Sequence, residues 1–228
     1  MRWTTFAFSI MVFVSSFSTA GAYTAVFEPV DTPYEVITIT DDPMIERSIL
    51  GELEGSPEMF EITSDVEFTL TVEIRAITES GTAPEFAGIV IRQKESRGVE
   101  EVARLRATDA DWLRVIDSET GLPYFAGPFW SQSVPAGTYR IEVSTPENTG
   151  KYILVVGSQD DTKGYLESIR NVSEAYEFYD ASTLRMFNSP YIHYPLGIIL
   201  LIFLLGGTWW WLRSRIIHAL TNYHCMCC

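Results

Sequence analysis

Apolar and polar residues alternate along much of the chain between residues 36 and 156. Every second residue from Phe68 to Ile74 is apolar, and the same holds from Tyr139 to Val143. A period of two places such side chains on one face of a β-strand. Alternating segments and short apolar runs together predict strands at 36–40, 67–74, 88–91, 102–105, 112–116, 138–143 and 151–156. Turn-forming Gly, Pro, Asn and Asp residues separate them, so we predict a mostly β fold, an antiparallel β-sandwich of about seven to nine strands.

The period changes after Gly157. Between residues 163 and 187, spacings of three and four, which mark one face of a helix, separate Leu166, Ile169, Val172, Tyr176, Tyr179 and Thr183. We predict an amphipathic juxtamembrane helix within residues 161–190, stopped by Pro190. Its apolar face must cover the sandwich, lie on a bilayer or meet a partner protein.

The segment 191–212 has no acidic residue, lysine or arginine. As a helix it would be about 33 Å long, which matches a hydrocarbon core of about 30 Å. Aromatic residues, which favour the membrane interface, stand at both ends: Tyr191, Tyr194, Trp209, Trp210 and Trp211. Arg213 and Arg215 follow directly, so the positive-inside rule predicts a transmembrane helix with a cytoplasmic tail at 213–228.

The N-terminus has the features of a secretory signal. Arg2 precedes an apolar stretch at 6–17, and Ala20-Gly21-Ala22 forms a cleavage site. We predict a signal peptide at 1–22 and an ectodomain at 23–160 outside the cell membrane, in a single-pass protein. An uncleaved N-terminal anchor is the alternative.

Composition narrows the chemistry of the ectodomain. The stretch from Tyr23 to Tyr191, which comprises the ectodomain and the juxtamembrane helix, holds all 30 acidic residues and 13 of the 16 basic ones, a formal charge of −17 that repels nucleic acid. It contains neither His nor Cys. Nucleophilic triads with an imidazole base and zinc sites are thereby excluded. We predict no enzymatic activity and no cofactor, with a carboxylate glycosidase as the remaining enzymatic alternative.

Aromatic residues gather around a Gly/Pro-rich segment: Trp112, Tyr124, Phe125, Phe129 and Trp130. On a loop of a sandwich, such rings either form a platform on which a sugar stacks or plug one end of the sandwich. They are the tentative ligand-binding residues of this chain.

Metal sites have little support in the sequence. Asp109 and Asp111 are weak calcium candidates, as are the pairs at 41–42 and 160–161, because calcium takes six to eight oxygen ligands. The last residues include Cys225, Cys227 and Cys228, which either bind a soft metal, carry an acyl chain or form a reduced, unstructured tail. We predict no bound metal.

Two groups of segments resemble a known family. The segments 48–55 (SILGELEG), 59–62 (MFEI) and 66–74 (VEFTLTVEI) resemble the opening strands of the bacterial pre-peptidase C-terminal (PPC) domain. The segments 134–143 (VPAGTYRIEV) and 150–156 (GKYILVV) resemble its closing strands. The resemblance covers about residues 37–157 and implies a jelly-roll-like β-sandwich that serves as an accessory or ligand-binding module. Tyr139 and Tyr152 are expected to pack together on neighbouring antiparallel strands.

These features predict a membrane-tethered β-sandwich that binds or displays something at the outer face. Its expected partners are the lipid bilayer and either a surface glycan or another membrane protein. The alternative is a structural or accessory subunit of a larger membrane complex, with contacts through the juxtamembrane helix and the Gly206-Gly207 side of the span.

Overall fold

The computed structural model describes residues 25–27, 32, 34–40, 42–77, 85–94, 98–159 and 164–224. The expected signal peptide at 1–22 lies outside these residues, and so do the acidic pair at 160–161, Asp41 and the three cysteines Cys225, Cys227 and Cys228.

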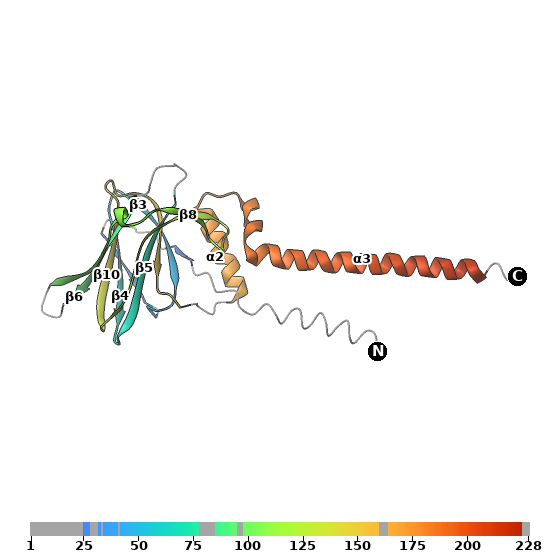
Figure 1. The fold of residues 1–228 in the computed structure, drawn as a ribbon, viewed down its shortest axis with the longest axis horizontal. Coiled ribbons are helices and arrows are strands. Elements are labelled where there is room, and N and C mark those ends of the chain that lie inside the picture. Colours follow the sequence, from blue (N-terminus) through green and yellow to red (C-terminus); the bar gives the residue numbers. More distant parts are fainter. Residues whose placement is uncertain are drawn as a thin grey trace.

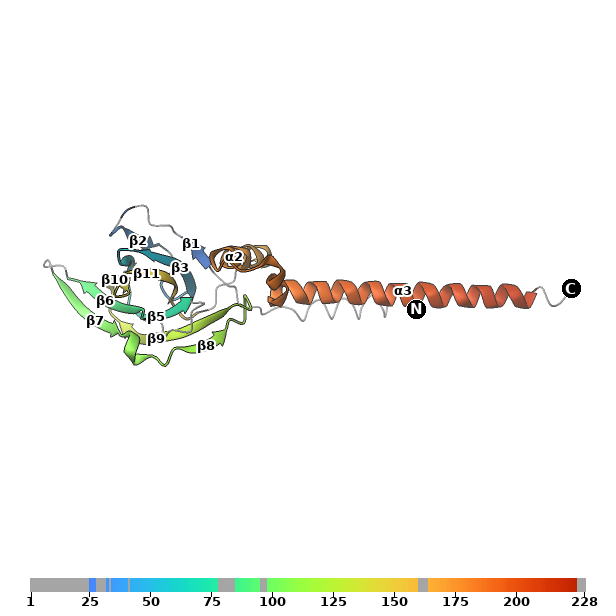
Figure 2. The same ribbon diagram turned by 90° about the horizontal axis from the view of Figure 1, so that it is seen from above.

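Within the described residues, the ectodomain forms two stacked β-sheets (Figures 1 and 2). The six-stranded sheet has the order β1 (Ala25–Phe27), β3 (Arg47–Glu54), β11 (Thr149–Val156), β5 (Phe68–Ile77), β9 (Pro123–Val134) and β8 (Leu113–Ile116). The five-stranded sheet has the order β2 (Val36–Ile39), β4 (Glu58–Ser64), β10 (Gly137–Ser144), β6 (Ala87–Gln93) and β7 (Val99–Leu105). The predicted mostly β fold, a sandwich followed by a helix, is confirmed.

The expectation of purely antiparallel sheets is wrong at two edges. Strand β1 pairs with β3 in parallel, and β2 pairs with β4 in parallel. Every other pairing of named strands in the described residues is antiparallel. Alternation reports which face of a strand is buried and contains no information on the direction of its neighbour. The sequence therefore could not reveal these parallel edges.

Strand β9 corrects the expectation that the aromatic residues from Tyr124 to Trp130 lie on a loop. It runs for 12 residues although it contains two prolines. Pro123 is its first residue, and β8 pairs only with positions 123–126, so Pro128 faces no strand on that side. The pairing of β9 with β5 also shifts register between Glu73 and Arg75. Prolines are tolerated at strand starts, edges and bulges, which is where these two lie.

The main core lies between the two sheets and is built from alternate residues of the long strands. Strand β5 shows the pattern most clearly, since Leu70, Val72 and Ile74 are fully buried. Tyr139 and Tyr152 are fully buried too. They belong to β10 and β11, which lie in opposite sheets. Our expectation that they pack on neighbouring strands is therefore wrong. After β10 the chain crosses to the other sheet and there forms β11.

Helix α2 (Tyr165–Phe178) packs on the outer face of the six-stranded sheet. Val172, Ala175 and Tyr176 join the sheet residues Leu50 and Ile153 in a second apolar cluster. Of the three alternatives for the amphipathic helix, the structure shows the first, a cover for the sandwich. The helix is shorter than its apolar pattern, because the chain leaves the helical conformation at Asp180, where φ is 51°. A 3₁₀ helix, η2 (Thr183–Asn188), follows.

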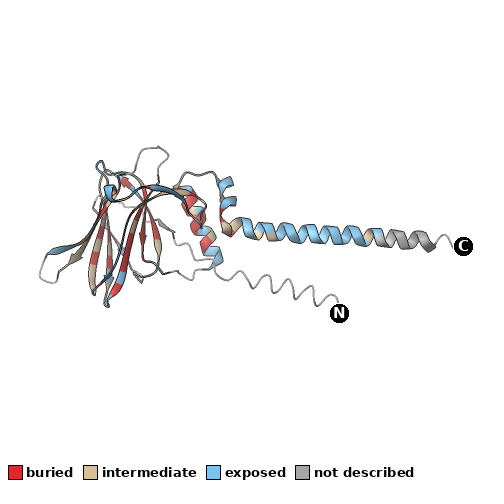
Figure 3. Ribbon diagram, in the orientation of Figure 1, coloured by how far each residue is buried: buried red, intermediate tan, exposed pale blue. Residues whose placement is uncertain are grey.

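Helix α3 (Pro190–His224) projects away from the sandwich (Figure 1). Its segment Pro190–Arg215 has a mean hydropathy of 1.8 and is long and apolar enough to cross a membrane. Both ribbon views show the five-stranded sheet on the side far from α3, with the six-stranded sheet and then α2 closer to it (Figures 1 and 2). Figure 3 shows buried residues on α2, whereas η2 and most of α3 are exposed.

Candidate functional site

The aromatic residues expected to form a ligand platform do not share a surface. Trp112 is 9% exposed and belongs to the main core. Its Nε1 donates a hydrogen bond to the carbonyl oxygen of Ala107 over 2.8 Å. Its ring lies so close to Gly127 that a Cβ atom there would be 2.5 Å from the indole. Trp112 therefore has no free face for stacking and forms part of the main core.

The other four rings are divided between the two faces of β9. Phe125 and Trp130 pack against the main core. Tyr124 lies on the outer side under the guanidinium of Arg75, 4.7 Å from the ring centroid. Phe129, at 65% exposed, is the one well-exposed ring of the five. A strand turns successive side chains to opposite sides, so aromatic residues that are close in sequence are separated here.

Asp109 and Asp111 are both exposed and lie at the end of η1 (Ala107–Asp109) and just beyond it. Among the described residues, no group of three or more His, Cys, Asp or Glu side chains could hold a metal ion. Within that part of the chain, the two carboxylates belong to no such group.

The residues expected to anchor the chain at the membrane differ in their surroundings. Tyr194 and the three tryptophans Trp209, Trp210 and Trp211 are exposed on α3, as are Arg213 and Arg215. The Arg215 guanidinium lies 4.9 Å from the centroid of the Trp211 ring. Tyr191 is 4% exposed. Its ring is therefore held within the protein and is not available to a lipid interface.

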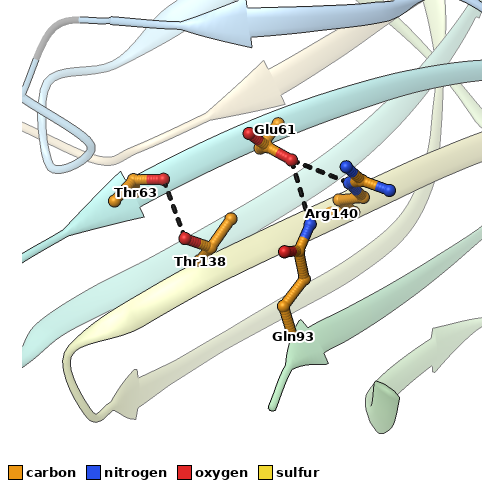
Figure 4. Close-up of polar contacts among 5 residues, drawn as sticks. All are labelled: Glu61, Thr63, Gln93, Thr138 and Arg140. Carbon is orange, nitrogen blue, oxygen red and sulfur yellow. Dashed lines mark hydrogen bonds and ion pairs between the residues drawn. The ribbon is translucent and has the colours of Figure 1, made fainter. Parts of the chain in front are cut away.

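Among the described elements, no α-helix lies on the outer face of the five-stranded sheet (Figures 1 and 2). On it the Glu61 carboxylate accepts hydrogen bonds from Arg140 Nε over 2.8 Å and from Gln93 Nε2 over 3.0 Å (Figure 4). Beside them, the Thr63 and Thr138 hydroxyls are 3.0 Å apart. These residues come from three adjacent strands, β4, β10 and β6. We call this surface the open sheet face.

The open sheet face also carries apolar side chains. Ile91 stands opposite Arg140 in the pairing of β6 with β10, and Ile89 stands opposite Glu142. Both isoleucines are partly exposed, while Val90 between them is fully buried. The face is thus a mixture of internally paired charges and half-exposed aliphatic groups.

A second candidate site is the joint between the sandwich and α3, formed by the β8–β9 turn, α2, η2 and the first turn of α3. The Tyr191 hydroxyl donates to the Glu119 carboxylate, and the Tyr165 hydroxyl donates to the Tyr191 carbonyl oxygen. The Ser189 hydroxyl donates to the Glu119 carbonyl oxygen over 2.7 Å. The Tyr176 hydroxyl lies 2.9 Å from the Thr120 carbonyl oxygen. Side chains from the turn, from α2, from α3 and from Ser189 between η2 and α3 therefore hold the joint in one arrangement.

The β8–β9 turn is shaped to fit this joint. Asp117 Oδ1 accepts hydrogen bonds from the backbone N–H groups of Glu119 and Thr120 over 2.7 and 3.2 Å. Gly121 has a φ of 74°, and a Cβ atom there would be 3.0 Å from Asn188. Glycine meets both requirements, since it accepts a positive φ and allows a close approach.

One buried polar pair lies at the edge of the main core. Tyr152 donates a hydrogen bond of 2.5 Å to the carboxylate of Glu58, which is 8% exposed. Burial raises the pKa of Glu58 above its ordinary value, and the hydrogen bond from Tyr152 opposes that rise. Burial and the neighbouring Glu58 charge also raise the pKa of the Tyr152 hydroxyl.

A shallow cavity of about 310 Å³ lies between the sheets at one end of the sandwich and is lined in part by Arg92, Val134 and Tyr139. Arg92 donates to the Ala136 carbonyl oxygen over 2.6 Å. The Tyr139 hydroxyl donates to the Pro135 carbonyl oxygen over the same distance. These polar groups donate hydrogen bonds to the β9–β10 turn. Their place in the cavity wall is therefore explained by their role in holding that turn.

The sequence did not identify the open sheet face or the joint. The alternation of Glu61 and Arg140 with apolar residues shows that they point outward, but not that they are neighbours. Glu119 stands in a turn, and the position of α3 brings the Tyr191 hydroxyl to its carboxylate.

Comparisons with protein-family profiles and with curated protein sequences find no match to this chain. Among solved structures, the chain is similar to the pre-peptidase C-terminal domain of collagenase from Bacillus anthracis. The identity is 14% and the TM-score 0.35, over 56% of this chain and 98% of that domain. This solved domain is of the same kind as the one that the sequence segments resemble. At this identity and TM-score, nothing follows from the similarity about a ligand or an activity.

Proposed function

We propose that this chain is a non-enzymatic, single-span membrane protein. It presents its β-sandwich on the outer side of the cell membrane as an interaction module, with the C-terminus in the cytoplasm. The observation that carries this proposal is the order of the layers. The six-stranded sheet is covered by α2 on the side of the apolar helix α3, and the open sheet face points the other way (Figures 1 and 2).

Several features favour a protein partner at the open sheet face over a glycan. The aromatic rings that would stack on a sugar are separated, and Trp112 is buried. On the open sheet face, by contrast, Ile89 and Ile91 are partly exposed beside the ion pair of Arg140 with Glu61. A protein partner could bury these apolar groups while the polar groups remain paired with one another.

The joint favours a second candidate function, an accessory subunit of a larger membrane complex. A module that is only tethered needs no fixed orientation, whereas here Tyr191 and Ser189 fix the start of α3 against the sandwich. On α3, nothing lies within 4 Å of a Cβ atom built at Gly206 or Gly207. Small residues let another transmembrane helix approach closely.

A protease-protection experiment tests the topology. Protease added to intact cells or spheroplasts should digest the sandwich and spare a C-terminal label placed after Cys228. The orientation follows from Arg213 and Arg215, which stand at the cytoplasmic end of the span under the positive-inside rule. A sandwich that resists protease in intact cells, but is digested after lysis, would refute the proposal.

Copurification in mild detergent distinguishes the two functions. We compare the wild type with an open-face variant, Ile89→Glu with Ile91→Glu, and with a span variant, Gly206→Leu with Gly207→Leu. Loss of a stoichiometric partner from the open-face variant alone supports the interaction module. Loss from the span variant alone supports the complex subunit, and loss from neither contradicts both assignments of the contact surface.

A further inference from the structure

The charge of the chain changes abruptly at η2. Asp180 is the last acidic residue of the sequence, although the ectodomain before it is strongly acidic. Between Asp180 and Arg213, the single Lys or Arg residue is Arg185, which lies on η2 and is exposed. The segment that leads into the span therefore lacks the negative charge that an anionic lipid surface would repel.

Two large apolar side chains of η2 are turned away from the protein. Leu184 is 75% exposed and Phe187 is 51% exposed. A 3₁₀ helix has three residues per turn, so positions three apart lie on the same side. Leu184 and Phe187 thus form one apolar edge. Met186 between them packs against the cluster under α2, which explains why that residue is less exposed.

The position of η2 relative to the span matches the membrane interface. Counting back from Trp210, about 20 helical residues cross a hydrocarbon core, which places the outer boundary close to Tyr191 and Tyr194. Figure 1 shows η2 beside the first turn of α3 and running across its axis. With α3 along the bilayer normal, η2 therefore lies along the outer surface, at the level where the hydrocarbon begins.

The joint holds η2 in this position. The Tyr176 hydroxyl of α2 lies 2.7 Å from the Arg185 carbonyl oxygen. Directly after η2, the Ser189 hydroxyl donates to the Glu119 carbonyl oxygen of the β8–β9 turn over 2.7 Å. Contacts at Arg185 and at Ser189 thus hold η2 with Leu184 and Phe187 turned outward, where an apolar environment outside the protein would cover them.

We propose that η2 is an interfacial foot that rests in the outer leaflet. Leu184 and Phe187 insert at the boundary between headgroups and acyl chains, and Arg185 meets the lipid phosphates. The partner is a phospholipid bilayer, because η2 directly precedes α3, whose exposed apolar residues begin at Tyr194 and Leu196. The foot and the span together would set the tilt of the sandwich over the membrane. This inference rests on the proposed function, since it requires α3 to span a bilayer.

Site-directed spin labelling tests the foot on the full-length chain. The three C-terminal cysteines are changed to serine, and the chain is placed in nanodiscs of phosphatidylcholine and phosphatidylglycerol. Single labels are introduced with Leu184→Cys on the foot, Leu204→Cys in the span and Val99→Cys on β7. The wild-type side chains are 75%, 58% and 62% exposed, so all three positions can accept a label. Collision rates with oxygen, which enters lipid, and with a water-soluble nickel chelate are measured for each.

The oxygen-to-nickel ratio at position 184 should lie between the high ratio at 204 and the low ratio at 99. A ratio at 184 equal to that at 99 overturns the foot and leaves the span intact. A low ratio at 204 as well shows that α3 is not in the bilayer, which overturns the proposed function itself. Protection of 184 from both reagents shows that a protein covers η2, and this also overturns the lipid assignment.

A charge variant provides a second, independent readout. A label at Asn188→Cys is compared in the presence and absence of Leu184→Glu with Phe187→Glu. The two carboxylates should lower the oxygen-to-nickel ratio at 188 to that of position 99, with the melting temperature of the sandwich unchanged. Val66→Glu, at a position 68% exposed on the sandwich, is the matched control and should leave the ratio unchanged. An unaltered ratio in the Glu variant refutes the foot.

Discussion

The buried pair of Tyr152 and Glu58 allows a sharp test of the core. We consider Tyr152→Phe, which retains the ring and removes only the hydroxyl. The ring is fully buried and lies 5.6 Å from that of Phe86, centroid to centroid. Its packing should therefore survive. The Glu58 carboxylate, in contrast, loses the hydrogen bond that it accepts over 2.5 Å. A buried polar group left without its partner costs about 1–3 kcal/mol of unfolding free energy.

The cost should depend on pH, and its sign follows from the pKa of Glu58. Burial raises this pKa in the folded state above the ordinary value of 4.5, so the folded protein holds the proton more tightly than the unfolded one. The stability linked to this proton is fully present below pH 4.5 and is lost as the pH rises through the folded pKa. Without the Tyr152 hydroxyl the folded pKa rises further, so the loss becomes larger. Tyr152→Phe should thus be more destabilising at neutral pH than at pH 4.

The measurement is urea unfolding of the full-length chain in nonionic detergent at pH 4 and pH 7, followed by near-ultraviolet circular dichroism. Glu58→Gln is the matched variant, because an amide oxygen can still accept from Tyr152 but carries no charge. It should flatten the pH dependence, and Tyr152→Phe should cost less in its background. An equal cost of Tyr152→Phe at both pH values and in both backgrounds would show that the pair is not coupled.

Two further predictions concern the core and the separated aromatic rings. Tyr139→Ala should lower the unfolding free energy by about 3–5 kcal/mol, because a fully buried ring that packs edge-on against Phe68 leaves a cavity; an unchanged urea midpoint would contradict the burial. Trp112→Ala should cost a similar amount, whereas Phe129→Ala, whose ring is mostly exposed, should change stability by less than about 0.5 kcal/mol. Acrylamide should quench Trp112 fluorescence poorly in a background that lacks the other tryptophans, and strong quenching would favour the platform.

The alternation of apolar and polar residues predicted several strands of the sandwich but missed strand β9. The alternation around Ile74 and Ile141 was enough to predict strands with buried faces, since period two has a direct geometric meaning. It failed at β9, where two prolines and Gly127 conceal a strand of 12 residues. Proline is unfavourable only where its missing N–H would face a neighbour. The absence of a neighbouring strand beside Pro128 is a property of the sheet and not of the local sequence.

The sequence by itself determined what each segment needs: a buried face for the alternating strands, a cover for the stripe around Tyr176, and an apolar environment for residues 191–212. These needs depend on local composition and periodicity, which a chain carries before it folds. The tertiary structure alone decided which of these segments lie against one another. It placed Tyr139 and Tyr152 in opposite sheets and paired Glu61 with Arg140. It also buried Tyr191 against the turn of Glu119, because contacts between residues distant in sequence depend on strand order and chain crossing, which no local pattern records.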